Sequence, residues 1–122
     1  TIIQDAPFVM RDPTVLGSGW KPGNFSSGKF YGPSPLRLGI ELSRNLMTVR
    51  LANQVGMAKI AETAERFKVA EEMPPVLAMA LGSGETTLLK LTTAYAMFVN
   101  GGKRIEPSFI DRIQDRRHPI PP

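Results

Sequence analysis

The sequence predicts a mainly α-helical fragment with irregular or β segments at both ends. Residues 1–33 are rich in Gly and Pro, which permit turns and short strands but no long helix. Residues 34–102 carry apolar side chains at helical spacing, and residues 103–122 return to an irregular, Pro-rich composition. We therefore divide the chain into a loop-rich lead-in, a helical part, and a return strand with a tail.

The first helix is expected to begin just after the lead-in. Ser34 is a favourable N-cap, and Pro35 would occupy the first helical position, where its missing N–H is harmless. On this short helix Leu36, Ile40 and Leu42 are expected to face inward.

Two further helices and one short turn are expected in the middle of the chain. A helix over Met47–Val55 would stop at Gly56, which readily adopts the left-handed conformation of a helix end. Apolar residues then recur at i, i+3, i+4, i+7 and i+10 from Met57 to Phe67, which is the clearest short helical pattern in the chain. Val76–Leu81 is expected to form a short apolar helix or turn.

The last helix is expected over Thr86–Val99, and the Gly pair after Asn100 would end it. One apolar stripe on this helix is expected to lie in the core: Leu88, Leu91, Tyr95, Phe98 and Val99. Beyond it, loose alternation up to Ile113 predicts a return strand that starts near Pro107, at a sheet edge because Pro cannot donate to a ladder.

The composition excludes several classes of function. The 122 residues contain no Cys, which excludes disulfide frameworks and Cys-based zinc sites, and His118 is the only His. The net charge of +4 is spread along the chain rather than gathered in a stripe, so no nucleic-acid partner is expected. The longest apolar stretch is far shorter than the roughly 20 residues that a membrane span needs.

Ser43-Arg44-Asn45, on a connection between two helices, is the first candidate for chemistry. A Ser hydroxyl can accept and donate a proton, and an Asn amide two residues later offers a donor and an acceptor. Such a pair can relay a proton and hold an amide substrate. The simpler interpretation is that Ser43 caps a carbonyl and Asn45 is the N-cap of the next helix.

Three other patterns carry less information. Ser26 and Lys29 have the Ser-x-x-Lys spacing of an activated nucleophile, but Gly28 and the following Gly and Pro residues prevent the helix that this geometry requires. The turn at 82–87 lacks the Lys of a phosphate-binding loop. The aromatic and basic residues at 20–25 have no basic groove around them, so they predict a packed loop.

Nine short pieces of the chain are informative through their order. They are Asp5-Ala6-Pro7, Trp20-Lys21-Pro22-Gly23-Asn24-Phe25, Pro35-Leu36-Arg37, Ser43-Arg44-Asn45 with Thr48-Val49-Arg50-Leu51, Val55-Gly56-Met57, Ala80-Leu81-Gly82, Glu85-Thr86-Thr87, Thr92-Thr93-Ala94-Tyr95-Ala96 and Asn100-Gly101-Gly102. This series closely resembles the transpeptidase domain of class A penicillin-binding proteins, the bifunctional enzymes that build bacterial peptidoglycan. The resemblance covers about residues 1 to 115.

The resemblance implies a fold and a mechanism. The chain would be the helical subdomain of an α+β, β-lactamase-like transpeptidase fold. In this family a Ser of a Ser-x-x-Lys motif attacks the D-Ala-D-Ala amide, and an amine from a second strand resolves the acyl-enzyme into a cross-link. Ser43 would pass a proton to the leaving amine, and Asn45 would hydrogen-bond the amide of the substrate or of a β-lactam side chain. Arg44, the variable middle position, receives no role.

The resemblance also implies what lies elsewhere. The nucleophile motif should precede Thr1, and a Lys-Thr/Ser-Gly motif should follow Pro122, so the fragment alone is expected to be inactive. Partners would be the stem peptide, β-lactams and the rest of the domain, with no metal or organic cofactor. The parent would lie at the periplasmic face of the inner membrane, anchored through a segment absent here. The alternative is a non-catalytic relative that scaffolds cell-wall assembly.

Overall fold

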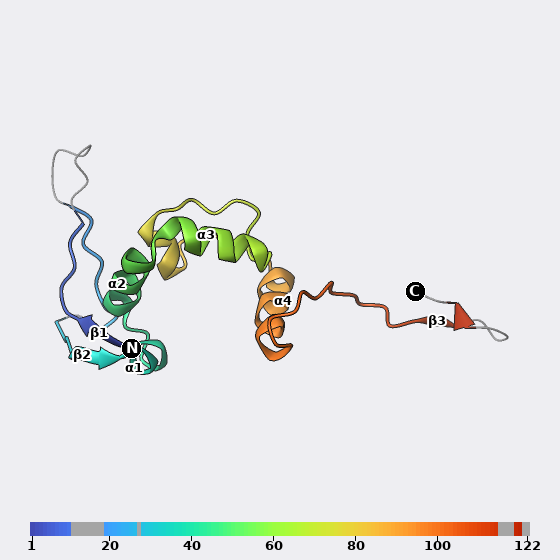
Figure 1. Cartoon of the computed structure of the whole chain (residues 1–122), viewed down its shortest axis with the longest axis horizontal. Helices are drawn as coiled ribbons and strands as arrows, with labels where there is room; N and C mark the ends of the chain where they lie inside the picture. The colour runs from blue at the N-terminus through green and yellow to red at the C-terminus, as the bar shows by residue number, and fades with distance from the viewer. Residues whose placement is uncertain (11–18, 27, 115–118, 121–122) are drawn as a thin grey trace.

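The structure is a computed structural model that describes residues 1–10, 19–26, 28–114 and 119–120. Figure 1 shows a curved arrangement of short helices, with a small sheet near one end and an extended segment after the last helix. In chain order the elements are β1 (Ile2–Asp5), β2 (Gly32–Pro35), α1 (Leu36–Glu41), α2 (Asn45–Val55), α3 (Met57–Arg66), the 3-10 helix η1 (Leu77–Leu81), α4 (Leu88–Val99), β3 (Ile113–Gln114) and β4 (Pro119–Ile120).

Helix α2 is the centre of the packing, and β1, α1, α3 and η1 all contact it. Figure 1 shows α2 between the small sheet and the start of α3. One face of α2 is fully covered, and Val49 on that face packs with Ala52, Met57 and Leu77 in a hydrophobic cluster. The expected helix over Met47–Val55 is therefore confirmed, with a start two residues earlier at Asn45.

Strands β1 and β2 pair in antiparallel register, with Ile3 opposite Ser34 and Asp5 opposite Gly32. The side chains of Ile3 and Asp5 lie on the buried face of β1. The prediction that Ser34 caps the first helix is wrong, because pairing with β1 keeps Ser34 in the strand. Its hydroxyl donates to the Gly32 carbonyl, and Pro35 takes the N-cap position without a side-chain hydrogen bond.

The prediction of which residues of α1 face inward is also only partly correct. Leu36 is half-buried, but Ile40 and Leu42 are 71% and 50% exposed. The buried residue of this helix is Gly39, where a Cβ atom would lie 3.0 Å from the Met47 Cε. The two helices therefore approach each other closely at this glycine.

The later helices lie where they are expected, although η1 starts one residue later and α4 two residues later than predicted. Helix α3 follows the apolar pattern from Met57, and η1 ends at Gly82 in the left-handed conformation. The Thr87 side chain caps α4 by accepting a hydrogen bond from the Lys90 amide. At the other end of α4, the Gly102 amide donates to the Met97 carbonyl, as in a glycine-terminated helix.

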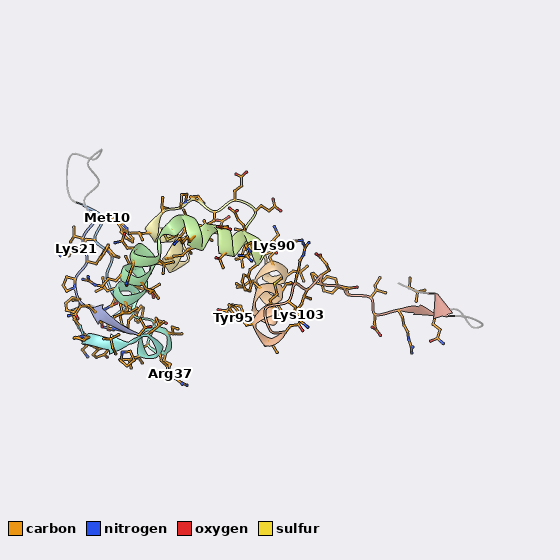
Figure 2. All side chains as sticks on the ribbon, viewed as in Figure 1. Met10, Lys21, Arg37, Lys90, Tyr95 and Lys103 are labelled. Carbon is orange, nitrogen blue, oxygen red and sulfur yellow. The ribbon has the colours of Figure 1, made fainter. Side chains whose placement is uncertain are left out.

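The prediction that the apolar stripe of α4 lies in the core is wrong. Its five residues are between 41% and 91% exposed, and the buried residues of the helix are Thr93, Ala94 and Met97. Helix α4 contacts the end of α3, where the rings of Phe67 and Phe98 stack with centroids 5.3 Å apart. Figure 2 shows Tyr95 projecting from α4 on the side where α2 lies, without reaching it.

The prediction of a return strand that starts near Pro107 is largely wrong. Residues 103–112 extend away from α4 without regular structure (Figure 1). Strand pairing begins only at Ile113, opposite Ile120. Every residue of this segment except the half-buried Ile105 is exposed, so neither face of a strand would be covered. His118 lies outside the described residues.

No helix in the described part of the chain has both the length and the apolar composition needed to cross a membrane.

Replacing Val49 by Ala should lower the free energy of unfolding by about 2–3 kcal/mol, because it removes two buried methyl groups and leaves a cavity. The matched control is Val55→Ala on the same helix. Val55 is 45% exposed, whereas Val49 is 0% exposed. Urea unfolding of both variants, followed by circular dichroism, tests this prediction. Equal losses for the two variants would contradict the central place of α2 in the core.

Candidate functional site

The Ser43-Arg44-Asn45 segment forms a tight turn between α1 and α2. The Ser43 amide donates to the Ile40 carbonyl at 3.2 Å, and the Arg44 amide donates to the Gly39 carbonyl at 2.8 Å. Ser43 has a φ of 50°, in the left-handed region that a non-glycine residue seldom occupies. Ser43 is exposed and Asn45 is half-buried, so both side chains can meet a ligand from solvent.

The Arg44 side chain points in the opposite sense, into the molecule, and only 3% of the residue is exposed. Its guanidinium donates to three separate acceptors: the Asp5 carboxylate at 2.8 Å, the Ser26 hydroxyl at 2.9 Å and the Lys29 carbonyl at 2.7 Å. The same group lies over the ring of Tyr31, 4.3 Å from its centroid. Arg44 therefore joins the turn to β1 and to the loop at 23–31.

Asp5 completes this buried ion pair. One carboxylate oxygen accepts from the Asn24 side chain at 2.9 Å, and the other accepts from the Tyr31 amide at 3.1 Å as well as from Arg44. Burial alone would raise the pKa of Asp5. The hydrogen bonds from Asn24, Tyr31 and Arg44, with the positive charge of Arg44, outweigh burial and hold the pKa below its ordinary value of 3.8.

The start of α2 is capped by the neighbouring loop. The Asn24 side-chain oxygen accepts from the Leu46 amide at 3.2 Å, which satisfies a donor that the helix itself leaves free. Asn45 is the first residue of α2 and its Nδ2 donates to the Gly23 carbonyl at 3.0 Å. The interpretation of Asn45 as an N-cap is therefore wrong, because Arg44 holds the cap position and no side chain caps from it.

A second arginine of α2 fixes the chain that follows β1. The Arg50 guanidinium donates to the carbonyls of Ala6 and Pro7 and lies over the ring of Phe8, 5.4 Å from its centroid. Arg44 at the N-cap position and Arg50 within α2 thus both hold residues 5–8 against the helix.

The other sequence patterns are structural in the described residues. Ser26 and Lys29 lie in a loop, and both contact Arg44, one through its hydroxyl and the other through its carbonyl. In the turn at 82–87, Thr87 caps α4. The described ranges contain no group of three or more His, Asp or Glu residues placed to hold a metal ion.

Sequence reasoning did not find the Arg44 network, although Asp5, Asn24 and Arg44 each belong to a motif of the resemblance. One signal was available: Asp5 is an acidic residue at an inward position of a short alternating strand. A buried carboxylate needs a partner, and the sequence offers many cations without showing which of them meets it.

Comparison with known proteins now defines the class. The family described as "Penicillin binding protein transpeptidase domain" matches residues 1–122. The chain belongs to this family of transpeptidase domains.

The individual proteins to which the chain is similar share one name, penicillin-binding protein 1A. The chain is 44% identical over 119 residues to penicillin-binding protein 1A of Rickettsia conorii, and the match covers 98% of this chain and 15% of that protein. It is 38% identical over 117 residues to penicillin-binding protein 1A of Neisseria meningitidis, covering 95% of this chain and 14% of that protein.

The crystal structure of penicillin-binding protein 1A from Haemophilus influenzae superposes with a TM-score of 0.83 at 36% sequence identity. The superposition covers 93% of this chain and 17% of that chain. These matches confirm the predicted family and the α+β fold class. The chain spans only about one seventh of the length of the curated relatives.

The depressed pKa of Asp5 predicts a loss of stability in acid. The unfolded chain takes up this proton at higher pH than the folded chain does. The stabilisation by Asp5 is therefore complete above its ordinary pKa of 3.8 and is lost as the pH falls through the lower folded value. Unfolding by urea should be measured from pH 7 to pH 2.5.

The control is Asp5→Asn, which leaves Arg44 buried without its counter-charge and should cost about 3–5 kcal/mol at neutral pH. This variant should lose part of the acid slope. If Asp5→Asn and the original chain showed parallel acid slopes, Asp5 would not be the group responsible.

Proposed function

We propose that this chain is the central part of a peptidoglycan DD-transpeptidase and supplies its Ser-x-Asn motif. The observation that carries the proposal is the turn between α1 and α2. Ser43 and Asn45 face solvent there, while the residue between them is anchored in the interior. The buried Arg44 side chain fixes the turn that carries these two polar groups, and a preorganised site requires its groups to be fixed in this way.

In the proposed reaction a nucleophilic Ser outside this chain attacks the D-Ala-D-Ala amide carbonyl. The amide C–N bond breaks, the acyl group stays on the nucleophile, and the leaving amine takes up a proton. The neighbouring base takes the hydroxyl proton of the nucleophile during the attack. The Ser43 hydroxyl donates its own proton to the leaving amine and receives the proton that the base carries, so it acts as a relay. An amine of a second stem peptide then attacks the acyl-enzyme carbonyl. The ester C–O bond breaks, the amine loses a proton that returns to the nucleophilic Ser, and the new amide bond is the cross-link.

Asn45 would orient the substrate. Its Nδ2 donates to the Gly23 carbonyl, which fixes the orientation of the amide group. The Oδ1 is then the natural acceptor for the N–H of a substrate amide or of a β-lactam side chain. A carboxamide held in one orientation loses less freedom on binding than a mobile one.

The proposal also covers the whole protein. The nucleophile and the Lys-Thr/Ser-Gly strand would come from other parts of the domain, which is why residues 1–122 are expected not to react with penicillin alone. The exposed apolar stripe of α4 would be covered by those parts. The parent would work at the periplasmic face of the inner membrane, where stem peptides and β-lactams are met.

Substituting Ser43 or Asn45 by Ala in the full-length protein should slow acylation by a fluorescent penicillin. A lost proton relay costs about 10²–10⁴-fold, and a lost hydrogen bond to substrate costs about tenfold. Second-order labelling rates, read from gels of quenched time courses, give both numbers.

The matched controls are Ser83→Ala and Asn53→Ala, which remove the same side chains from exposed positions outside the turn. They should label at the original rate. Unchanged labelling of the Ser43 and Asn45 variants would reject the site assignment. A coding region without Ser-x-x-Lys upstream and Lys-Thr/Ser-Gly downstream would favour the non-catalytic scaffold.

A further inference from the structure

We propose that Arg44 is a positioning residue, which sets the geometry of both Ser43 and Asn45 through a ring of hydrogen bonds that starts from the buried Arg44–Asp5 pair. This inference rests on the proposed function of those two residues. It gives a role to the middle residue of the motif, whose side chain reaches neither solvent nor a substrate on the solvent side of the turn.

The first half of the ring acts on Ser43. A left-handed conformation costs a residue other than glycine about 1–2 kcal/mol, so it persists only where neighbouring contacts impose it. The amides of Ser43 and Arg44 are both tied to the last turn of α1, and three hydrogen bonds fix the Arg44 side chain. The backbone between these anchors cannot rotate without breaking one of these hydrogen bonds.

The second half of the ring acts on Asn45. Asp5 receives Arg44 on one oxygen and Asn24 on the other. Asn24 in turn holds the first turn of α2, and its neighbour Gly23 accepts from Asn45. The circuit therefore runs from Arg44 through two side chains and a backbone carbonyl to the amide that is proposed to bind substrate.

The chemistry of this position favours Arg over Lys. A guanidinium presents five N–H groups in a rigid planar fork and can satisfy three acceptors in different directions while it stacks on a ring. The Asp5, Ser26 and Lys29 acceptors and the Tyr31 ring match that arrangement. A Lys ammonium keeps the charge opposite Asp5 but cannot reach all three acceptors from one atom.

The test compares two acylating agents in the full-length protein. Benzylpenicillin carries the side-chain amide that Asn45 is proposed to bind. The bare penicillin nucleus has a free amine instead. Arg44→Lys should slow acylation by both agents, because Ser43 is displaced. It should slow benzylpenicillin about tenfold more, since that agent also loses the oriented Asn45 contact. The measured quantity is the ratio of the two second-order acylation rates.

A purely structural role would leave this ratio unchanged, because unfolded molecules react with neither agent. The matched control is Arg50→Lys, which weakens a comparable clamp on α2 that does not reach the turn. It should lower the melting temperature and keep the original ratio. Ser26→Ala is the milder second variant, since it removes one acceptor of Arg44 and should shift the ratio in the same direction by a smaller factor.

The outcomes separate the two proposals. If Asn45→Ala shifts the ratio but neither Arg44→Lys nor Ser26→Ala does, the positioning role is wrong and the proposed function stands. If Asn45→Ala itself leaves the ratio unchanged, the assignment of Asn45 fails and the positioning role falls with it. Where Arg44→Lys does not fold, Ser26→Ala decides: a selective loss supports the proposal and an unchanged ratio overturns it.

Discussion

Burying a guanidinium costs several kcal/mol of hydration free energy unless protein groups take the place of the lost water. The described structure around Arg44 meets this requirement. Its acceptors come from positions 5, 26 and 29, up to 39 residues away in the sequence. The chain can satisfy the charge only by bringing β1 and the 23–31 loop to the start of α2. The same arrangement leaves the two neighbours of Arg44 on the opposite, solvent-facing side.

Local sequence signals predicted the elements whose cause is local. The apolar rhythm of α3 and the glycines after α4 both act within a few residues, and both expectations are confirmed. The prediction that Ser34 caps a helix was wrong because the cause of its structure is not local. Pairing with β1, about 30 residues earlier in the chain, overrides its preference for a helix cap. The composition of Gly32–Pro35 does not predict this pairing.

The site was predictable only in outline. The resemblance pointed to Ser43 and Asn45, yet residue spacing alone could not show that Arg44 turns inward. Burial of a charge depends on partners that are distant in sequence. The stripe of α4 shows the same limit, because periodicity indicates that a helix face needs a cover without saying where the cover is. In the described residues that cover is absent, and the chain spans about one seventh of its curated relatives.

The Asp5–Arg44 pair also restricts how this segment can diverge. Removing one member leaves the other as a buried, uncompensated charge. Exchanging both for apolar residues of similar volume can leave the free energy of unfolding nearly unchanged. The two positions lie 39 residues apart, but the stability that each residue contributes depends on the other. Among descendants of this sequence they should therefore change together or remain as they are. A relative with a different middle residue in its motif should differ at the end of the first strand as well.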